Sequence, residues 1–327
     1  MPDHARRGQT SNETHAMMPS MTIRPAATAL FGAFCLALAP GLAEASPCCA
    51  GSTTPGFESL ALWEKLAAGV RLGFDRGLGQ WDAHGLWHPD DRYSESTLRG
   101  EFWLLERVAD AWQLGLRLPA THLWRHAGDL SDDGGGIGDL GASARYDVYA
   151  GGEGPLGLGV ALVGSLVAPT GRPTDQASGA LGADVTGEGH FMPGLGVALM
   201  RPFGDAFVRL QTGLGVPLSR RIEGRDTRRG PDLQTSLVLG DAPVTSLTLS
   251  VSLSHRYEAA THVDGAALPQ SARASLFAGA GLAWDLPAPV ENLALQASCQ
   301  LPLPLDRVGQ NLIAGLGATL GLRVGWP

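Results

Sequence analysis

The sequence has few charged residues, few aromatic residues and almost no lysine. Of its 327 residues, 17% are Asp, Glu, Lys or Arg and 6% are aromatic, and Lys65 is the single lysine among 24 basic residues. The formal net charge is −8. A nucleic-acid-binding protein would show a basic footprint, so this charge balance argues against a nucleic-acid partner.

Long apolar runs and a cysteine framework are missing as well. No stretch after residue 45 approaches the ~18 uninterrupted apolar residues of a membrane-spanning helix, which excludes a polytopic helical membrane protein. The four cysteines are too scattered to form a disulfide framework. Glycine, in contrast, is abundant, at 45 residues, and 44% of the chain is hydrophobic. This mixture is too apolar for a disordered chain and too rich in glycine for a helical one.

The N-terminal region predicts a cleaved export signal over residues 1–45. Arg24 precedes an apolar run over residues 26–39, and Ala43-Glu44-Ala45 forms a small-x-small cleavage site, so the mature chain would begin near Ser46. The alternative is a retained membrane anchor, for which the apolar run is short. Residues 46–65, with Cys48 and Cys49, are then expected to form a periplasmic N-terminal segment ahead of a domain over residues 66–327.

The remaining sequence alternates between apolar and polar residues with a period of two. In the C-terminal stretch 312–326, leucine, alanine and valine occupy every second position, and glycine, threonine and arginine lie between them. A strand gathers such residues on one face, whereas a helix would scatter them around its circumference. Twelve segments show this pattern: 66–76, 95–107, 111–121, 138–150, 156–168, 189–200, 205–217, 232–240, 245–258, 272–286, 292–303 and 312–326.

The connections between these segments alternate between short turns and long polar loops. This alternation, an even number of strands and segments of 11 or more residues are typical of an outer-membrane barrel. We therefore predict an all-β fold, a transmembrane antiparallel up-and-down β-barrel of about twelve strands, in the outer membrane of a Gram-negative bacterium. The alternative is a soluble β-sandwich, whose strands would usually be shorter.

If the apolar face meets lipid, the polar face lines the lumen. Two interpretations remain open for these side chains: they pair with one another across a narrow lumen, or they form a charged constriction in a conduit. The candidate lumen-lining residues are Arg71, Arg99, Glu101, Arg117, Asp139, Arg145, Asp147, Arg209, Arg256, Arg273, Asp285 and Arg323.

Two short motifs resemble a family of outer-membrane barrels. Gly136-Ile137-Gly138-Asp139-Leu140 resembles the "GxGD" strand entry of the MetA-pathway phenol-degradation-like proteins, and Ala168-Pro169-Thr170-Gly171 resembles their "P-T-G" strand exit. The resemblance covers roughly residues 136–216. It implies an outer-membrane barrel that transports small solutes, including apolar or aromatic ones.

Histidines and cysteines suggest a second function, the handling of a transition metal. His84 and His88, like His122 and His126, are four residues apart, and on a helical turn such a pair can bind one Zn or Cu ion. Cys48 and Cys49 could bind a soft metal. The alternative is that these histidines are polar loop residues beside an outer aromatic girdle, and that the cysteines lie incidentally in a flexible tail.

No catalytic motif supports an enzyme. Neither a G-x-S-x-G elbow nor an H-E-x-x-H pair is present. The match of residues 136–141 to a dinucleotide fingerprint lacks the helix that must follow it. The sequence therefore predicts an outer-membrane channel or transporter without a cofactor, in contact with membrane lipid and a small solute. A metal-handling barrel is the first alternative and a lipid-modifying enzyme is the second. The oligomeric state is left open.

Overall fold

The computed structural model describes residues 58–89, 93–287, 292–306 and 308–327. The chain divides into a unit of residues 1–42, none of which is described, and a unit of residues 43–327, which holds all the strands. The expected signal segment, with its cleavage site, and the Cys48–Cys49 pair lie outside the described residues. No helix of the described part is long and apolar enough to cross a membrane.

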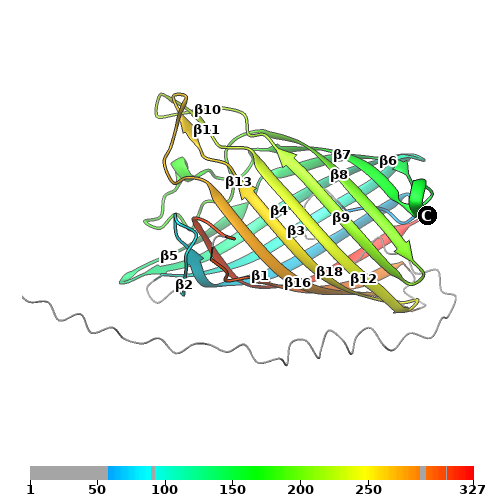
Figure 1. Ribbon diagram of the computed structural model, residues 1–327. Helices are drawn as coiled ribbons and strands as arrows, with labels where there is room; N and C mark the ends of the chain where they lie inside the picture. The colour runs from blue at the N-terminus through cyan, green and yellow to red at the C-terminus, as the bar shows by residue number, and fades with distance from the viewer. Residues whose placement is uncertain (1–57, 90–92, 288–291, 307) are drawn as a thin grey trace, which may run out of the picture. The chain divides into compact units, whose positions relative to one another are not determined.

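Within the described residues, twelve strands form one closed antiparallel barrel (Figure 1). Each strand pairs with the next one along the chain, and β18 pairs with β1 to close the circle. The barrel strands are β1 (Leu66–Trp81), β3 (Tyr93–Ala109), β4 (Trp112–Ala127), β6 (Leu140–Tyr149), β7 (Gly159–Ala168), β8 (Met192–Phe203), β9 (Ala206–Gly215), β12 (Asp232–Val244), β13 (Leu247–Glu258), β16 (Arg273–Asp285), β17 (Leu293–Pro302) and β18 (Leu312–Trp326). The predicted twelve-stranded fold is thereby confirmed.

Closure satisfies the backbone polar groups without a free sheet edge. The β1–β18 pairing runs from Leu66 opposite Trp326 to Trp81 opposite Leu312, so both terminal strands are paired over almost their whole length. A hydrocarbon environment requires such closure because it offers no water to unpaired N–H and C=O groups. A β-sandwich, the soluble alternative, is excluded because its sheets would have open edges.

The outer surface of the barrel is apolar along the strands. On β1, Val70, Leu72 and Phe74 are 45%, 62% and 46% exposed, and they alternate with Arg71, Gly73 and Asp75, which are partly buried. The same pattern recurs on the other barrel strands, where leucines dominate the exposed large side chains. An apolar surface of this extent would be unfavourable in water and is the surface that a transmembrane barrel presents to lipid.

One predicted loop is a β-hairpin instead. Residues 122–137 were expected to form a polar connection, but β4 continues to Ala127 and β5 (Leu130–Ile137) returns along it. Gly128, at a positive φ of 60°, makes the tight turn between the two strands. β1 likewise extends to Trp81, where it pairs with the short β2 (Trp87–Pro89). Several strands therefore continue beyond the segments predicted from the sequence.

Two other long connections form a small sheet of their own. β10 (Arg220–Ile222), β11 (Arg225–Arg228), β14 (His262–Val263) and β15 (Ala266–Ala267) pair in that order. In Figure 1, β10 and β11 lie beyond the end of the barrel at which β2 and β5 are also found. Two 3-10 helices, η2 (Pro155–Gly157) and η3 (Thr174–Gln176), complete the described elements.

Candidate functional site in the barrel lumen

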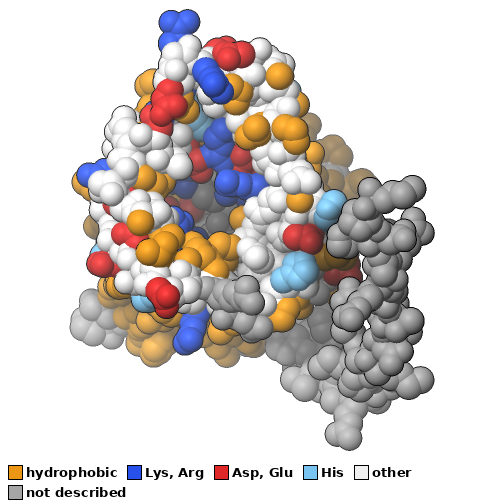
Figure 2. All heavy atoms as spheres, turned by 90° about the vertical axis from the view of Figure 1, so that its left-hand side faces the viewer, with side chains coloured by type: hydrophobic (Ala, Val, Ile, Leu, Met, Phe, Trp, Pro, Cys, Tyr) orange, Lys and Arg blue, Asp and Glu red, His pale blue; other side chains and the backbone are white. Residues whose placement is uncertain are grey.

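The two ends of the barrel differ in their connections. β1 begins and β18 ends at one end, which also carries the short turns between β3 and β4, β8 and β9, and β12 and β13. Because outer-membrane barrels place short turns and termini in the periplasm, we call it the periplasmic end. The opposite end, with β5 and the small sheet, is the outer end. Figure 2 looks into the outer end and shows arginine and acidic side chains inside the hollow.

Residues 58–65, the N-terminal strap, contact the lumen at the periplasmic end. Leu60 is 3% exposed and belongs to one apolar cluster with Ala67, Trp103 and Leu105. The Leu60 N–H donates to Oε1 of Gln113 on β4 at 2.9 Å. Residues 58–65, the described part of the segment predicted to be periplasmic, therefore pack at the periplasmic end of the lumen.

A buried ion pair holds the strap to β18, the strand that pairs with β1. Glu64 is fully buried, and Arg323 of β18 binds both of its carboxylate oxygens, with an Nη1–Oε1 distance of 2.5 Å. The Ala61 N–H donates to Oε2 of Glu64 at 2.7 Å. Arg107 of β3 donates to the carbonyl oxygens of Glu64 and Ala61 at 3.0 and 2.9 Å. Residues 259 positions apart in the sequence thus close part of the periplasmic opening.

The middle of the lumen contains a network of charges contributed by several strands. Nη1 of Arg71 lies 2.9 Å from Glu58 of the strap and 3.1 Å from Glu101 of β3. Arg117 of β4 reaches the other oxygen of Glu101 at 4.0 Å. Arg71 also lies over the ring of Trp103, 5.5 Å from its centroid. These side chains line part of a cavity of about 340 Å³.

The remaining candidate lumen residues lie in different surroundings. Arg145 and Gln113 both donate to Asp147, at 2.8 and 2.7 Å. Arg209 is buried beside the ring of Phe207. Arg273 and Asp285 are exposed at opposite ends of β16. Most of the candidate lumen-lining residues therefore form ion pairs, whereas Arg273 and Asp285 lie at the two ends of β16.

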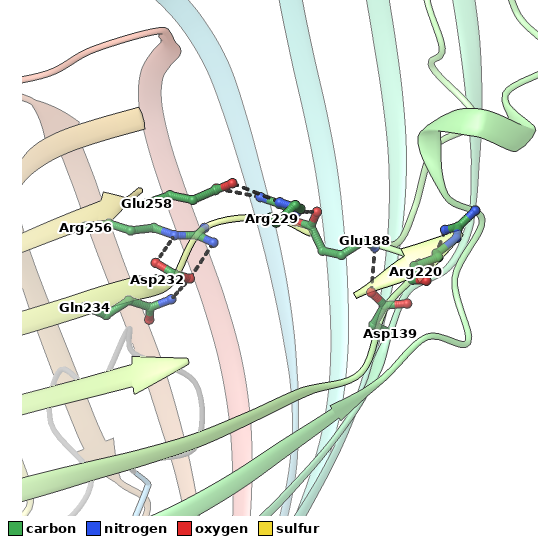
Figure 3. A network of polar contacts seen from close by, with 9 residues as sticks. Asp139, Glu188, Arg220, Arg229, Asp232, Gln234, Arg256 and Glu258 are labelled. Atoms are coloured by element: carbon green, nitrogen blue, oxygen red, sulfur yellow. Dashed lines mark hydrogen bonds and ion pairs between the residues drawn. The ribbon is translucent and has the colours of Figure 1, made fainter. Parts of the chain in front are cut away.

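At the outer end, a chain of ion pairs leads from the barrel wall into the mouth (Figure 3). Asp232 of β12 accepts two hydrogen bonds from Arg256 of β13, at 3.0 and 2.7 Å. Next to it, Glu258 accepts from Arg229 at 2.9 and 2.5 Å. Arg229, which lies in the β11–β12 connection, also pairs with Glu188 of the β7–β8 connection.

The two motifs that resemble the barrel family meet at this network. The Asp139 carboxylate accepts the N–H groups of Gly171 at 2.9 Å and of Glu188 at 2.6 Å. The Thr170 hydroxyl donates to the Gly138 carbonyl at 2.7 Å and accepts the Leu140 N–H at 2.9 Å. The "GxGD" and "P-T-G" stretches therefore fix the start of the β7–β8 connection and hold Glu188 in reach of Arg229.

The rest of the β7–β8 connection is fastened to the β4–β5 hairpin. Asp132 of β5 accepts the Leu181 and Ala183 N–H groups at 2.9 and 3.1 Å. Arg125 of β4 donates to the Leu181 carbonyl at 2.9 Å. Within the connection, the Ser178 hydroxyl and N–H hold the pKa of Asp184 well below its usual range, with Arg172 adding to the effect. This loop is an ordered cover at the mouth.

His190, near the end of the same connection, is a buried titratable group within this cover. Its pKa is lowered, chiefly because burial disfavours the charged imidazolium, with Arg220 acting in the same direction. Asp139 and Glu258 partly oppose the shift. In this arrangement of the mouth, the His190 imidazole is therefore neutral near neutral pH.

The candidate metal-binding histidines do not share helical turns. His122 and His126 lie on strand β4, where four residues span roughly 13 Å, so the helical-turn geometry expected for this pair is wrong. His122 instead contacts the ring of Trp124, at 4.5 Å between centroids.

His84 and His88 lie around a tight turn centred on Asp82. Asp82 accepts the Leu86 and His84 N–H groups and lies 3.0 Å from Nε2 of His88. These bonds, the Leu86 N–H first, lower the pKa of Asp82 to about 2.

A metal centre has no further support from the geometry. In the described ranges of the chain, no three His, Cys, Asp or Glu side chains gather in a group that could hold a metal ion. Cys48 and Cys49 lie outside those ranges. Zinc or copper binding by any of these residues stays a prediction, which calorimetry with Zn²⁺ would test.

Three of the side chains that close the two ends of the lumen are not among the residues predicted from the sequence. Glu64, Arg229 and Glu188 lie outside the alternating segments, and neither spacing nor periodicity marks them. The one available signal was the set of arginines in the 218–231 connection, an unusual number for a solvated loop.

Solved structures share this fold. The chain is similar to the COG4313 outer membrane channel from Pseudomonas putida F1, at a TM-score of 0.66 and 16% identity over 84% of this chain and 100% of that one. It is less similar to the β domain of the Bordetella autotransporter BrkA (TM-score 0.48, 16% identity, 80% and 100% covered). The CymD monoaromatic hydrocarbon channel gives a TM-score of 0.44 at 9% identity, with 88% and 99% covered.

Comparisons at the level of sequence add no family. No family model matches the chain, and no curated protein matches it. The resemblance to MetA-pathway phenol-degradation-like proteins is therefore not confirmed by a family model. What the comparisons show is an outer-membrane β-barrel of the kind found in channels.

Proposed function

We propose that the protein is a passive channel for small polar solutes across the outer membrane of a Gram-negative bacterium. One observation carries the proposal: the lumen is lined by ion-paired arginines and carboxylates around a cavity of about 340 Å³, as in the network of Arg71, Glu58 and Glu101. Charged linings of this kind set the selectivity of membrane pores. The closures at both ends make the path narrow, so small solutes are the cargo.

The charged lining of the lumen also indicates which class of solute the channel would carry. The resemblance to the phenol-degradation-like family implies apolar or aromatic solutes, but guanidinium and carboxylate groups would have to lose hydration to admit an apolar molecule. We therefore propose polar cargo. We propose no catalytic role, because the charges of the lumen are committed to one another in ion pairs such as Arg145–Asp147.

Planar-bilayer recording on refolded protein tests this function. We expect a small ohmic conductance in KCl, and a shift of the reversal potential towards cation selectivity when Arg209 and Arg256 are replaced by Gln, because each replacement removes a positive charge from the lining. Folded protein that carries no current, both as wild type and after the periplasmic closure is loosened by Glu64→Ala, would overturn the proposal.

A further inference from the structure

The outer half of the lumen contains a second cavity, of about 260 Å³, between the ion-pair chain of the mouth and the middle network. Three arginines from three strands line it: Arg99 of β3, Arg256 of β13 and Arg273 of β16. We call this space the outer cavity. It is large enough for a small organic molecule and smaller than the usual pocket for a drug-sized ligand.

Two of these arginines retain donors that the protein does not use. Arg256 binds Asp232 through Nε and Nη2, yet half of its side chain is exposed. Arg99 approaches Asp75 through Nε at 3.4 Å, and 57% of its side chain is exposed. A guanidinium has five N–H donors in a fixed fork, so each of the two has N–H groups left for a ligand.

Arg273 is the most available of the three. Within the described part of the chain it has no ion pair or hydrogen bond to another side chain. Its cross-strand partner is Glu258, and that carboxylate is already bound by Nε and Nη2 of Arg229 and is nearly fully buried. Arg273 therefore faces the outer cavity without an ion pair to Glu258, although Glu258 lies directly opposite it in the strand register, because Glu258 binds Arg229 instead.

The acids around the cavity are occupied. Arg99 approaches Asp75, Arg125 holds Glu95, and Arg229 holds both Glu188 and Glu258. A carboxylate that enters the cavity would thus meet free guanidinium donors, with the nearby negative charges already paired. Phe277 and Ile313 also line the space and offer apolar contact to a short alkyl group.

We propose that the outer cavity binds a small carboxylate anion, with Arg273 as the main contact and Arg256 and Arg99 as further donors. Arginine suits this ligand because its planar fork matches the two carboxylate oxygens. The identity of this ligand as cargo rests on the proposed channel function; the binding itself does not.

Calorimetry on the refolded full chain in detergent tests the site. The probe is butyrate, and butyramide serves as a neutral molecule of nearly the same shape. We expect saturable binding of butyrate, at least about tenfold weaker binding of butyramide, and at least about tenfold weaker butyrate binding by Arg273→Gln, because a hydrogen-bonded charge is lost. Arg228→Gln is the matched control: this exposed arginine lies on β11 of the separate small sheet and should leave binding unchanged.

Three results would overturn the proposal: no butyrate binding by the wild type, equal affinity for butyramide, or unchanged affinity in Arg273→Gln. Circular dichroism of each variant checks that the barrel is folded, and because Arg273 is exposed at the start of its strand, the glutamine is tolerated. Butyrate binding in a barrel that carries no current would refute the channel and leave the site standing. Current without butyrate binding would refute the anion site and leave the channel standing.

Discussion

Removing the Glu64 carboxylate should release the N-terminal strap from the lumen. In Glu64→Ala, Arg323 would remain almost fully buried without the Glu64 carboxylate, since the Glu64 and Arg323 side chains are 0% and 7% exposed in the pair. Breaking a buried ion pair by removing one partner costs about 3–5 kcal/mol. The Ala61 N–H also loses its acceptor. The strap should therefore open at least about 100-fold more often, because each 1.4 kcal/mol is a factor of ten.

The sequence provides a sharp assay for this opening. Lys65, at the end of the strap, is the only lysine of the chain, so a lysine-specific protease can cut at one position. Its N–H is bound to the Trp326 carbonyl at 2.8 Å when the strap is closed. Cleavage of a locally opened segment follows the open population when reclosing is fast. We expect cleavage of Glu64→Ala to be faster by about two orders of magnitude.

The matched control for this experiment is Glu106→Ala. Glu106 lies on β3 near the same end of the barrel and points outward, and it is exposed, so its removal should change the cleavage rate by less than about twofold. The double variant Glu64→Ala/Arg323→Ala should recover part of the loss, because no unpaired charge stays buried. Equal cleavage rates in Glu64→Ala and wild type would refute the role of this pair in holding the strap.

Three further predictions concern the wall and the mouth. Leu320→Arg, on the lipid face of β18, should lower the unfolding free energy by about 2–4 kcal/mol in lipid vesicles, whereas Thr319→Arg, which faces the lumen cavity, should cost much less; equal losses would invert the assignment of faces. Asp139→Asn should loosen the β7–β8 connection and speed its cleavage by trypsin at Arg172, because the Gly171 and Glu188 N–H groups lose a charged acceptor. Finally, burial keeps His190 neutral and its pKa below the ordinary value, so lowering the pH through about 6.5 should favour the open form, in which the imidazole can protonate in water. Relative to the cleavage of an unstructured peptide at the same pH, which corrects for the lower activity of trypsin in acid, the connection should be cut faster at pH 5.5 than at pH 7.5 in wild type, and this difference should shrink in His190→Gln.

The sequence was sufficient for the barrel because strand periodicity is a local property. Along β18, Leu316, Ala318, Leu320 and Leu322 occupy every second position of the face predicted to meet lipid, and the structure exposes all four. The limits of the segments were harder to predict. Towards the outer end, β4 continues without an apolar face, as at His122 and His126, so its polar residues predict a loop. Gly128-Asp129 is the signal in this stretch that indicates a hairpin turn.

The closures at both ends could not be predicted in the same way. The Glu64–Arg323 pair joins residues 259 positions apart, and Arg229 of the β11–β12 connection meets Glu258 of β13 and Glu188 of the β7–β8 connection. Such contacts depend on which loops fold inward, and no short-range pattern encodes that. Of the motifs found in the sequence, only residues 136–140 and 168–171 contribute to the network at the mouth. Their sequences did not indicate the hydrogen bonds that they make there.

The scarcity of lysine has a structural counterpart in the lumen. Arg323 binds both oxygens of Glu64, Arg256 both oxygens of Asp232, and Arg229 both oxygens of Glu258. Each pair is bidentate, which a planar guanidinium allows and a lysine ammonium does not. A lysine at any of these positions would replace the fixed two-point contact with a single flexible ammonium group, and at position 256 it would lose the spare N–H groups that the proposed anion site uses. The preference for arginine therefore serves closure and recognition through the same side-chain geometry.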